Sequence, residues 1–176
     1  MDASGASSGK QETGAHRIYL GLGSNLGDRD AHLRSALARL AETVRITRVS
    51  AVWDTAPLLV EDQPRFHNIV VEGLTRLDPV ALLHVAKRIE RELGRIPGPR
   101  YGPRPVDIDI LLYDDLILET PELTIPHPQL ANRAFALAPL AEIAPRAWHP
   151  VLRREARELA LAAPPDDIRR VGPGPS

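Results

Sequence analysis

Residues 100–112 read Arg-Tyr-Gly-Pro-Arg-Pro-Val-Asp-Ile-Asp-Ile-Leu-Leu, and the two halves of this stretch differ in local chemistry. The glycine and prolines of the first half prevent an ordinary helix or a central strand. Residues 106–112 are β-branched and aliphatic apart from Asp107 and Asp109, a composition typical of a buried strand. The stretch therefore predicts an irregular loop that leads into a strand carrying two carboxylates.

The two carboxylates predict a metal site. Side chains alternate along a strand, so Asp107 and Asp109 face the same way, with Cα atoms about 6.5–7 Å apart. Two adjacent anions on a half-buried surface are costly unless a cation neutralises them. Carboxylate oxygens suit Mg²⁺, which also binds substrate phosphates. The alternative is that the arginines just upstream simply neutralise the pair.

Length, charge and composition restrict the class of protein. The chain has 176 residues, enough for one domain with a core, and a net charge of −1, which gives no bulk attraction to nucleic acid or an acidic membrane. It has no Cys, so disulfides and thiolate metal sites are excluded. No apolar run is long enough to span a bilayer, and the N-terminal residues lack the apolar segment of a secretory signal. We expect a cytoplasmic monomer with no nucleic-acid or membrane partner.

The pattern of apolar residues predicts one α+β domain. We expect a disordered tail over residues 1–15, a single domain over residues 16–163 and a frayed tail over residues 164–176. The order β-α-β-β-α-β indicates a ferredoxin-like fold, an antiparallel sheet with helices packed on it. The predicted strands are 17–22, 45–53, 66–74, 106–112 and a short one at 116–118, and the predicted helices are 28–41, 78–93, 132–137 and 152–162.

Two further features leave alternatives open. The glycine-rich segment 21–27 lacks the spacing of a dinucleotide fingerprint, so it is either a tight turn or a place where backbone approaches a ligand. Phe66 and Phe135 are the only Phe residues. They either fill the core or sandwich a flat heterocycle whose edge Asn68 reads. A single histidine beside prolines, His127, is more often structural than catalytic.

Taken together, the motifs resemble the 6-hydroxymethyl-7,8-dihydropterin pyrophosphokinase family of folate biosynthesis. The resemblance covers about residues 17–162 in the family's order. The matching segments are 18–26, 54–58, 62–64, 66–68, 100–111, 123–127, 132–135 and 139–145.

The resemblance implies an enzyme that transfers pyrophosphate from MgATP to the hydroxymethyl oxygen of 6-hydroxymethyl-7,8-dihydropterin and releases AMP. It implies that Asp107 and Asp109 bind two Mg²⁺ ions, and that Arg95 and Arg104 act with them in catalysis by stabilising charge on the transferred group. The implied ATP-binding residues are Arg100, Tyr101, Arg104, Ile110, Thr124, His127 and Arg133. The implied pterin-binding residues are Thr55, Ala56, Pro57, Leu58, Phe66, Asn68 and Phe135.

Three other functions remain to be distinguished from this one. A Mg²⁺-dependent kinase or nucleotidyltransferase would act on another small alcohol. A ferredoxin-like binding module would use the fold without catalysis. An RNA-binding module is disfavoured by the net charge and by the lack of aromatic residues on a central strand.

Overall fold

The computed structural model describes residues 14–58, 62–94 and 105–176. Its main elements follow the predicted order, and a short 3-10 helix precedes α3. The elements are β1 (His16–Ser24), α1 (Arg29–Leu40), β2 (Arg45–Val49), β3 (Val52–Thr55), β4 (Phe66–Thr75), α2 (Pro79–Glu92), β5 (Asp107–Tyr113), β6 (Leu118–Glu119), β7 (Thr124–Ile125), the 3-10 helix (Leu130–Asn132), α3 (Ala134–Ile143), β8 (Trp148–His149), β9 (Arg154–Glu155), α4 (Ala156–Ala162) and β10 (Ile168–Gly172).

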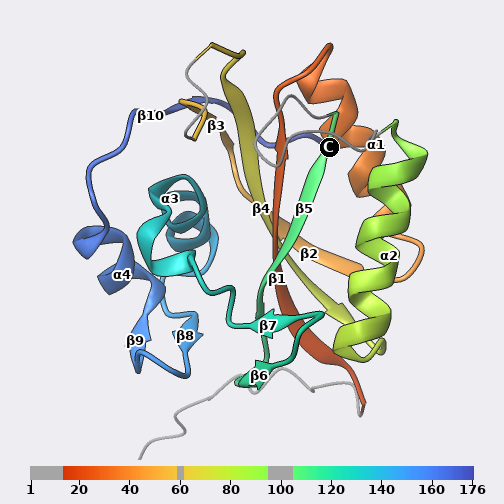
Figure 1. Cartoon of the computed structure of the whole chain (residues 1–176), viewed down its shortest axis with the longest axis vertical. Coiled ribbons are helices and arrows are strands. Elements are labelled where there is room, and N and C mark those ends of the chain that lie inside the picture. Colours follow the sequence, from red (N-terminus) through yellow and green to blue (C-terminus); the bar gives the residue numbers. More distant parts are fainter. Residues whose placement is uncertain (1–13, 59–61, 95–104) are drawn as a thin grey trace, which may run out of the picture.

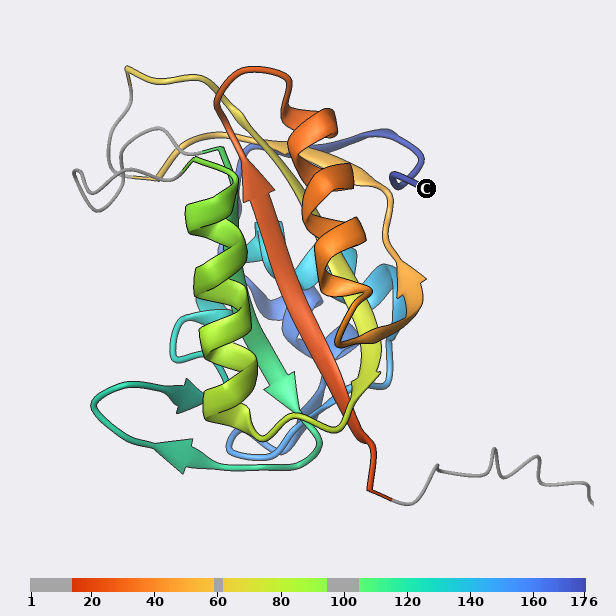
Figure 2. The same ribbon diagram turned by 90° about the vertical axis from the view of Figure 1, so that its right-hand side faces the viewer.

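The six-stranded sheet confirms the ferredoxin-like antiparallel fold. The strand order is β10-β3-β4-β1-β5, and β2 pairs with β4 beside β3. Every pairing is antiparallel. Helices α1 and α2 cover one face of the sheet and α3 and α4 the other, so the molecule has three layers (Figure 1). Figure 2 shows α1 and α2 side by side in front of the sheet.

Capping residues and alternating apolar residues explain these elements. The side chains of Asp28 and Asp78 accept hydrogen bonds from the third residue beyond them, at the starts of α1 and α2. Along β1, Ile18, Leu20 and Leu22 are buried beneath α1 and α2. The residues between them face α3 and α4.

Two expectations about strands are wrong. The predicted strand 45–53 is two strands, separated at Ser50, whose buried hydroxyl accepts from the amide of Val70 while its own amide donates to the Val70 carbonyl. Residues 168–172 form β10, paired with β3, although we expected a frayed tail over 164–176. We expected disorder over residues 1–15, and most of these residues lie outside the described part of the chain. Among the described residues, no helix is long and apolar enough to cross a membrane.

Candidate active site

The two aspartates of β5 lie on the face of the sheet that α3 covers. Ile108 and Ile110 point the other way, into the core beneath α1 and α2. Burial, and next the negative charge of Asp107, raises the pKa of Asp109 to about 6, although Arg133 and Lys87 partly offset this. A carboxylate whose negative form is disfavoured in this way gains by binding a cation, so the pair fits a divalent metal ion.

Across the described residues, no cluster of three or more protein ligands surrounds these aspartates. Mg²⁺ needs only one or two protein carboxylates, because it keeps several waters and binds substrate phosphates. A metal ion at Asp107 and Asp109 would complete its coordination with oxygens from outside the protein.

Two glycines of β1 leave the sheet surface bare beside the aspartates. Gly23 pairs with Asp107 of β5 on one side and with Asn68 of β4 on the other. A Cβ atom on Gly23 would lie 2.5 Å from Oδ1 of Asn68. The glycine-rich segment is therefore part strand and part turn. Gly21 and Gly23 are strand residues beside predicted site residues, and Gly27 lies in the turn with φ +65°.

The predicted pterin-binding residues of β3 and β4 come together at this end of the sheet. Thr55 pairs with Phe66, and the buried amide of Asn68 donates to the Thr55 hydroxyl at 2.6 Å. This bond fixes the orientation of the amide. Residues 56–58 continue directly from β3, and the Leu58 side chain is 37% exposed.

The region that leads into α3 brings further predicted residues to the aspartates. Nη1 of Arg133 lies 3.7 Å from Oδ2 of Asp109, and its guanidinium carbon lies 5.5 Å from the centre of the Phe135 ring. Burial, and then the charge of Arg133, lowers the pKa of His127 to about 4, against the opposing effect of Asp107. His127 is therefore neutral at physiological pH. Its Nδ1 accepts from the amide of Gln129 at 3.1 Å, so Nε2 carries the proton.

The other predicted residues are placed less directly. The Ile110 side chain is 4% exposed and packs in the core, so only its backbone can meet a ligand. Thr124 lies in β7, the neighbour of β6. Arg95, Arg100, Tyr101 and Arg104 are outside the described residues.

Sequence reasoning missed Glu90. Its carboxylate, 1% exposed, accepts from the amide of Ile108 at 2.8 Å, between the two aspartates, and Nζ of Lys87 lies 3.4 Å away. Glu90 thus fixes the backbone of the strand that carries the carboxylates. The available signal was its position on the apolar face of α2, eight residues after the buried Leu82, where an acidic residue is unusual.

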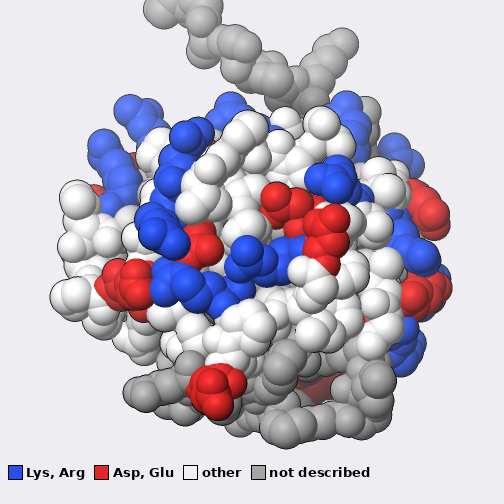
Figure 3. Space-filling view, turned by 90° about the horizontal axis from the view of Figure 1, so that it is seen from above, with Lys and Arg blue, Asp and Glu red and all other residues white. Residues whose placement is uncertain are grey.

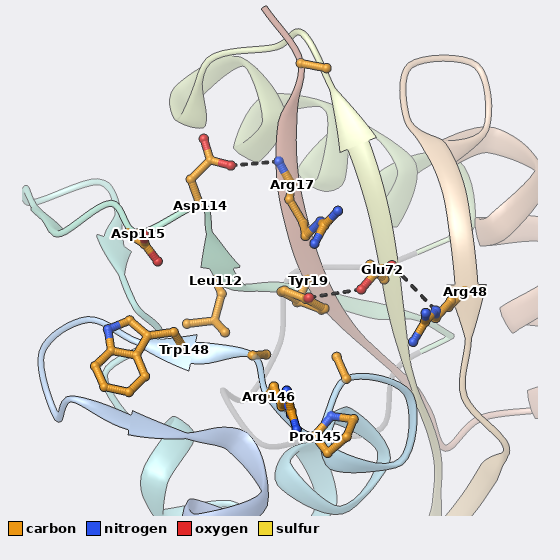
Figure 4. A pocket seen from close by; sticks show the side chains of 13 residues that line it. Arg17, Tyr19, Arg48, Glu72, Leu112, Asp114, Asp115, Pro145, Arg146 and Trp148 are labelled. Atoms are coloured by element: carbon orange, nitrogen blue, oxygen red, sulfur yellow. Dashed lines mark hydrogen bonds and ion pairs between the residues drawn. The ribbon is translucent and has the colours of Figure 1, made fainter. Parts of the chain in front are cut away.

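A separate hollow of about 710 Å³ lies at the other end of the same sheet face (Figure 4). On its floor the Tyr19 hydroxyl donates to Glu72 at 2.9 Å, and burial, followed by the charge of Glu72, raises the pKa of Tyr19. Its charged lining is balanced, and none of the predicted site residues takes part. The charged residues are Arg17, Arg48, Arg146, Glu72, Asp114 and Asp115.

Comparisons with known proteins show the family of this chain. Residues 19–145 match the model of the family described as 7,8-dihydro-6-hydroxymethylpterin-pyrophosphokinase. The chain is 48% identical over 127 residues to the 2-amino-4-hydroxy-6-hydroxymethyldihydropteridine pyrophosphokinase of Bacillus subtilis, covering 71% of this chain and 76% of that one. It is 42% identical over 158 residues to the protein of the same name from Pseudomonas aeruginosa, covering 88% and 96%.

A solved structure agrees on the fold. Wild-type HPPK-DHPS of Plasmodium falciparum superposes with a TM-score of 0.66 at 19% identity, over 84% of this chain. The chain spans 44% of that longer protein. The family match and the two bacterial relatives decide the assignment. The chain belongs to the 7,8-dihydro-6-hydroxymethylpterin-pyrophosphokinase family.

Proposed function

We propose that this chain transfers pyrophosphate from MgATP to 6-hydroxymethyl-7,8-dihydropterin. The hydroxymethyl oxygen attacks the β-phosphorus of ATP and loses its proton, the bond from that phosphorus to the bridging oxygen of the α-phosphate breaks, and AMP leaves. The observation that carries the proposal is the row Asn68, Gly23, Asp107 across three adjacent strands. The amide of Asn68 and the carboxylate of Asp107 share one surface along this row, which supports a pterin edge bound by the amide and a metal ion bound by the carboxylate.

The spacing of that row suits a pterin and its substituent. Neighbouring strands lie about 4.8 Å apart, so Asn68 and Asp107 are separated by about 10 Å at their Cα atoms. A ring held at its edge by Asn68 and Thr55 would extend over Gly23 and direct its hydroxymethyl group toward the aspartates. Phe66 and Phe135 would stack on its two faces, and the backbone of residues 56–58 would complete the edge contacts.

Asp107 and Asp109 are proposed to hold two Mg²⁺ ions. When bound, the ions would neutralise the crowded phosphate oxygens and align the attacking and leaving oxygens. In the structure Nη1 of Arg133 lies 3.7 Å from Oδ2 of Asp109. We propose that Arg133 turns toward the triphosphate when metal replaces it.

The remaining predicted residues are assigned to ATP. Arg95 and Arg104 would stabilise negative charge on the transferred group, and Arg100 and Tyr101 would contact the nucleotide. The neutral His127 would donate from Nε2 to a phosphate oxygen. Thr124 and the backbone of Ile110 would line the nucleotide site.

The decisive experiment incubates the protein with MgATP and 6-hydroxymethyl-7,8-dihydropterin and separates the nucleotide products. We expect AMP to form only when both substrates are present. Release of ADP would instead indicate an ordinary kinase acting on a small alcohol. A non-catalytic module predicts that Asp107→Ala changes stability alone, whereas we expect a loss of turnover of at least about 100-fold with the fold retained.

The oligomeric state and the cellular location of the chain belong to the same proposal. We propose that the chain acts as a monomer in the cytoplasm. Light scattering on the purified protein would measure its mass in solution, and cell fractionation would test its location.

A further inference from the structure

The connection between β3 and β4 is held at both of its described ends by hydrogen bonds to other elements. At its start, the amide of Ala56 donates to the main-chain oxygen of Asp167 at 3.1 Å, immediately before β10. At its end, the side-chain amide of Asn25 donates to the carbonyl of Pro64 at 3.2 Å, and the Arg29 side chain donates to the carbonyl of Arg65 at 2.9 Å.

The Arg65 side chain links these two ends. Its Nη1 and Nη2 donate to the Asp167 carboxylate at 2.6 and 3.3 Å, and Nη2 also donates to the Asp167 main-chain oxygen at 3.1 Å. Its Nε donates to the buried carboxylate of Asp54. One guanidinium thus joins the last residues of β3, the residue before β4 and the residue before β10. We name these three residues, Asp54, Arg65 and Asp167, the loop brace.

The loop brace lies directly beside the proposed pterin-binding residues. Ile168, the residue after Asp167, pairs with Thr55, and Thr55 pairs with Phe66 on its other side, so the strand that follows Asp167 is adjacent to β3. The Arg65 contacts also hold the pKa of Asp167 below its usual value. This end of the molecule carries acidic side chains flanked by Lys and Arg, as Figure 3 shows. Asp167 lies beyond residues 19–145, the part that matches the family model.

We propose that the loop brace positions the pterin-binding residues at the ends of the β3–β4 connection, which makes Arg65 and Asp167 positioning residues for the pterin. The proposal rests on the proposed function. The brace holds the backbone of Ala56, whose neighbours would contact the pterin edge, and it fixes the strand pairing of Thr55 and Phe66. Its loss therefore affects the pterin more than ATP, because the aspartates of β5 are held separately by Glu90.

Asp167→Asn is the principal test, because this side chain is 71% exposed and its neutral replacement leaves the core unchanged. We expect the KM for the pterin to rise about threefold, the usual scale for losing a largely exposed ion pair, with kcat and the KM for ATP nearly unchanged. Arg65→Gln should raise the KM for the pterin about tenfold, because Asp54 also loses the hydrogen bond from Arg65 Nε and keeps only the longer contacts with Arg29, His67 and Arg169. Arg65→Lys should recover part of this loss.

Arg170→Gln is the matched control. Arg170 is an exposed arginine of β10, the strand that follows Asp167. Its Nε lies 3.9 Å from Glu142 of α3, and it takes no part in the brace. This variant should keep the wild-type KM for both substrates. An equal rise in the pterin KM for Arg170→Gln and Asp167→Asn would overturn the proposal, because it would show a general weakening of β10.

A second measurement does not depend on activity. Amide hydrogen exchange at residues 55, 56, 58, 65 and 66 should be at least about threefold faster in Arg65→Gln than in the wild type or Arg170→Gln. Unchanged exchange, or faster exchange with an unchanged pterin KM, would overturn the proposal. If the wild type releases no AMP, the proposed function fails, and the exchange measurement alone decides whether the brace holds the connection.

Discussion

Replacing Gly23 by Ala adds one methyl group at the centre of the proposed pterin site. The new Cβ would lie 2.5 Å from Oδ1 of Asn68 and 3.4 Å from the Phe66 ring. Non-bonded carbon contacts are most favourable near 3.5–4 Å, so the amide has to move by roughly 1 Å. Asn68 is held by its 2.6 Å hydrogen bond to Thr55, and this movement breaks or lengthens that bond.

The expected cost falls on the reaction more than on stability. A misplacement of about 1 Å in a positioning group can reduce turnover by about 100-fold. The folded state loses only one side-chain hydrogen bond, about 1 kcal/mol. We therefore expect kcat/KM for the pterin to fall by about 30- to 100-fold, with a small change in Tm.

Gly21→Ala provides the control on the same strand and the same face. Its Cβ would meet the Leu111 side chain at 3.5 Å, an ordinary contact. Steady-state assays of AMP release with varied pterin, together with thermal unfolding, compare the two variants. Near-normal kinetics for Gly23→Ala, or an equal loss in Gly21→Ala, would refute the reasoning that the bare surface beside Asn68 receives the substrate.

Three other outcomes test the site. Asp109→Asn should abolish turnover yet raise the Tm of the metal-free protein, measured with a chelator present, because burial disfavours this charge. Glu90→Ala should lower the free energy of unfolding by about 2 kcal/mol in urea titrations by leaving the Ile108 amide unpaired, and Glu90→Gln should lose less. His127 has a pKa of about 4 in the folded protein and 6.5 as its reference value, so the unfolded chain binds the extra proton between these values. The contribution of His127 to stability should therefore rise from pH 4 to 6.5, while Asp109, whose pKa is raised, contributes in the opposite direction. The change of stability with pH should accordingly be less positive in His127→Asn than in the wild type.

The sequence predicted those parts of the fold whose determinants are local. The alternation around Asp107 and Asp109 was enough to place both carboxylates on one face of β5, and Asp28 and Asp78 marked the starts of α1 and α2. Strand β10 was missed because its residues lie among prolines and glycines. Its pairing partner, β3, is more than 100 residues earlier in the chain.

Parts of the site depended on contacts between distant segments and were therefore not predictable residue by residue. The sequence marks Gly23 only as part of a glycine-rich segment. Its position between Asn68 and Asp107 follows from the strand register, which the sequence does not reveal. Glu90 and Arg65 act through bonds to the backbone or to carboxylates on other elements. A sequence motif contains no direct trace of such pairs.

The position of β5 at the end of the sheet has a consequence for self-association. An edge strand offers unpaired amides and carbonyls on which a strand of another molecule can be added. Here the Glu90 carboxylate occupies the amide of Ile108, and the amide of His127 occupies the carbonyl of Leu111 at 3.0 Å. The contacts that hold the carboxylate strand thus also close its edge to an incoming strand. A substitution at Glu90 would expose that edge, and so favour aggregation as well as disturbing the site.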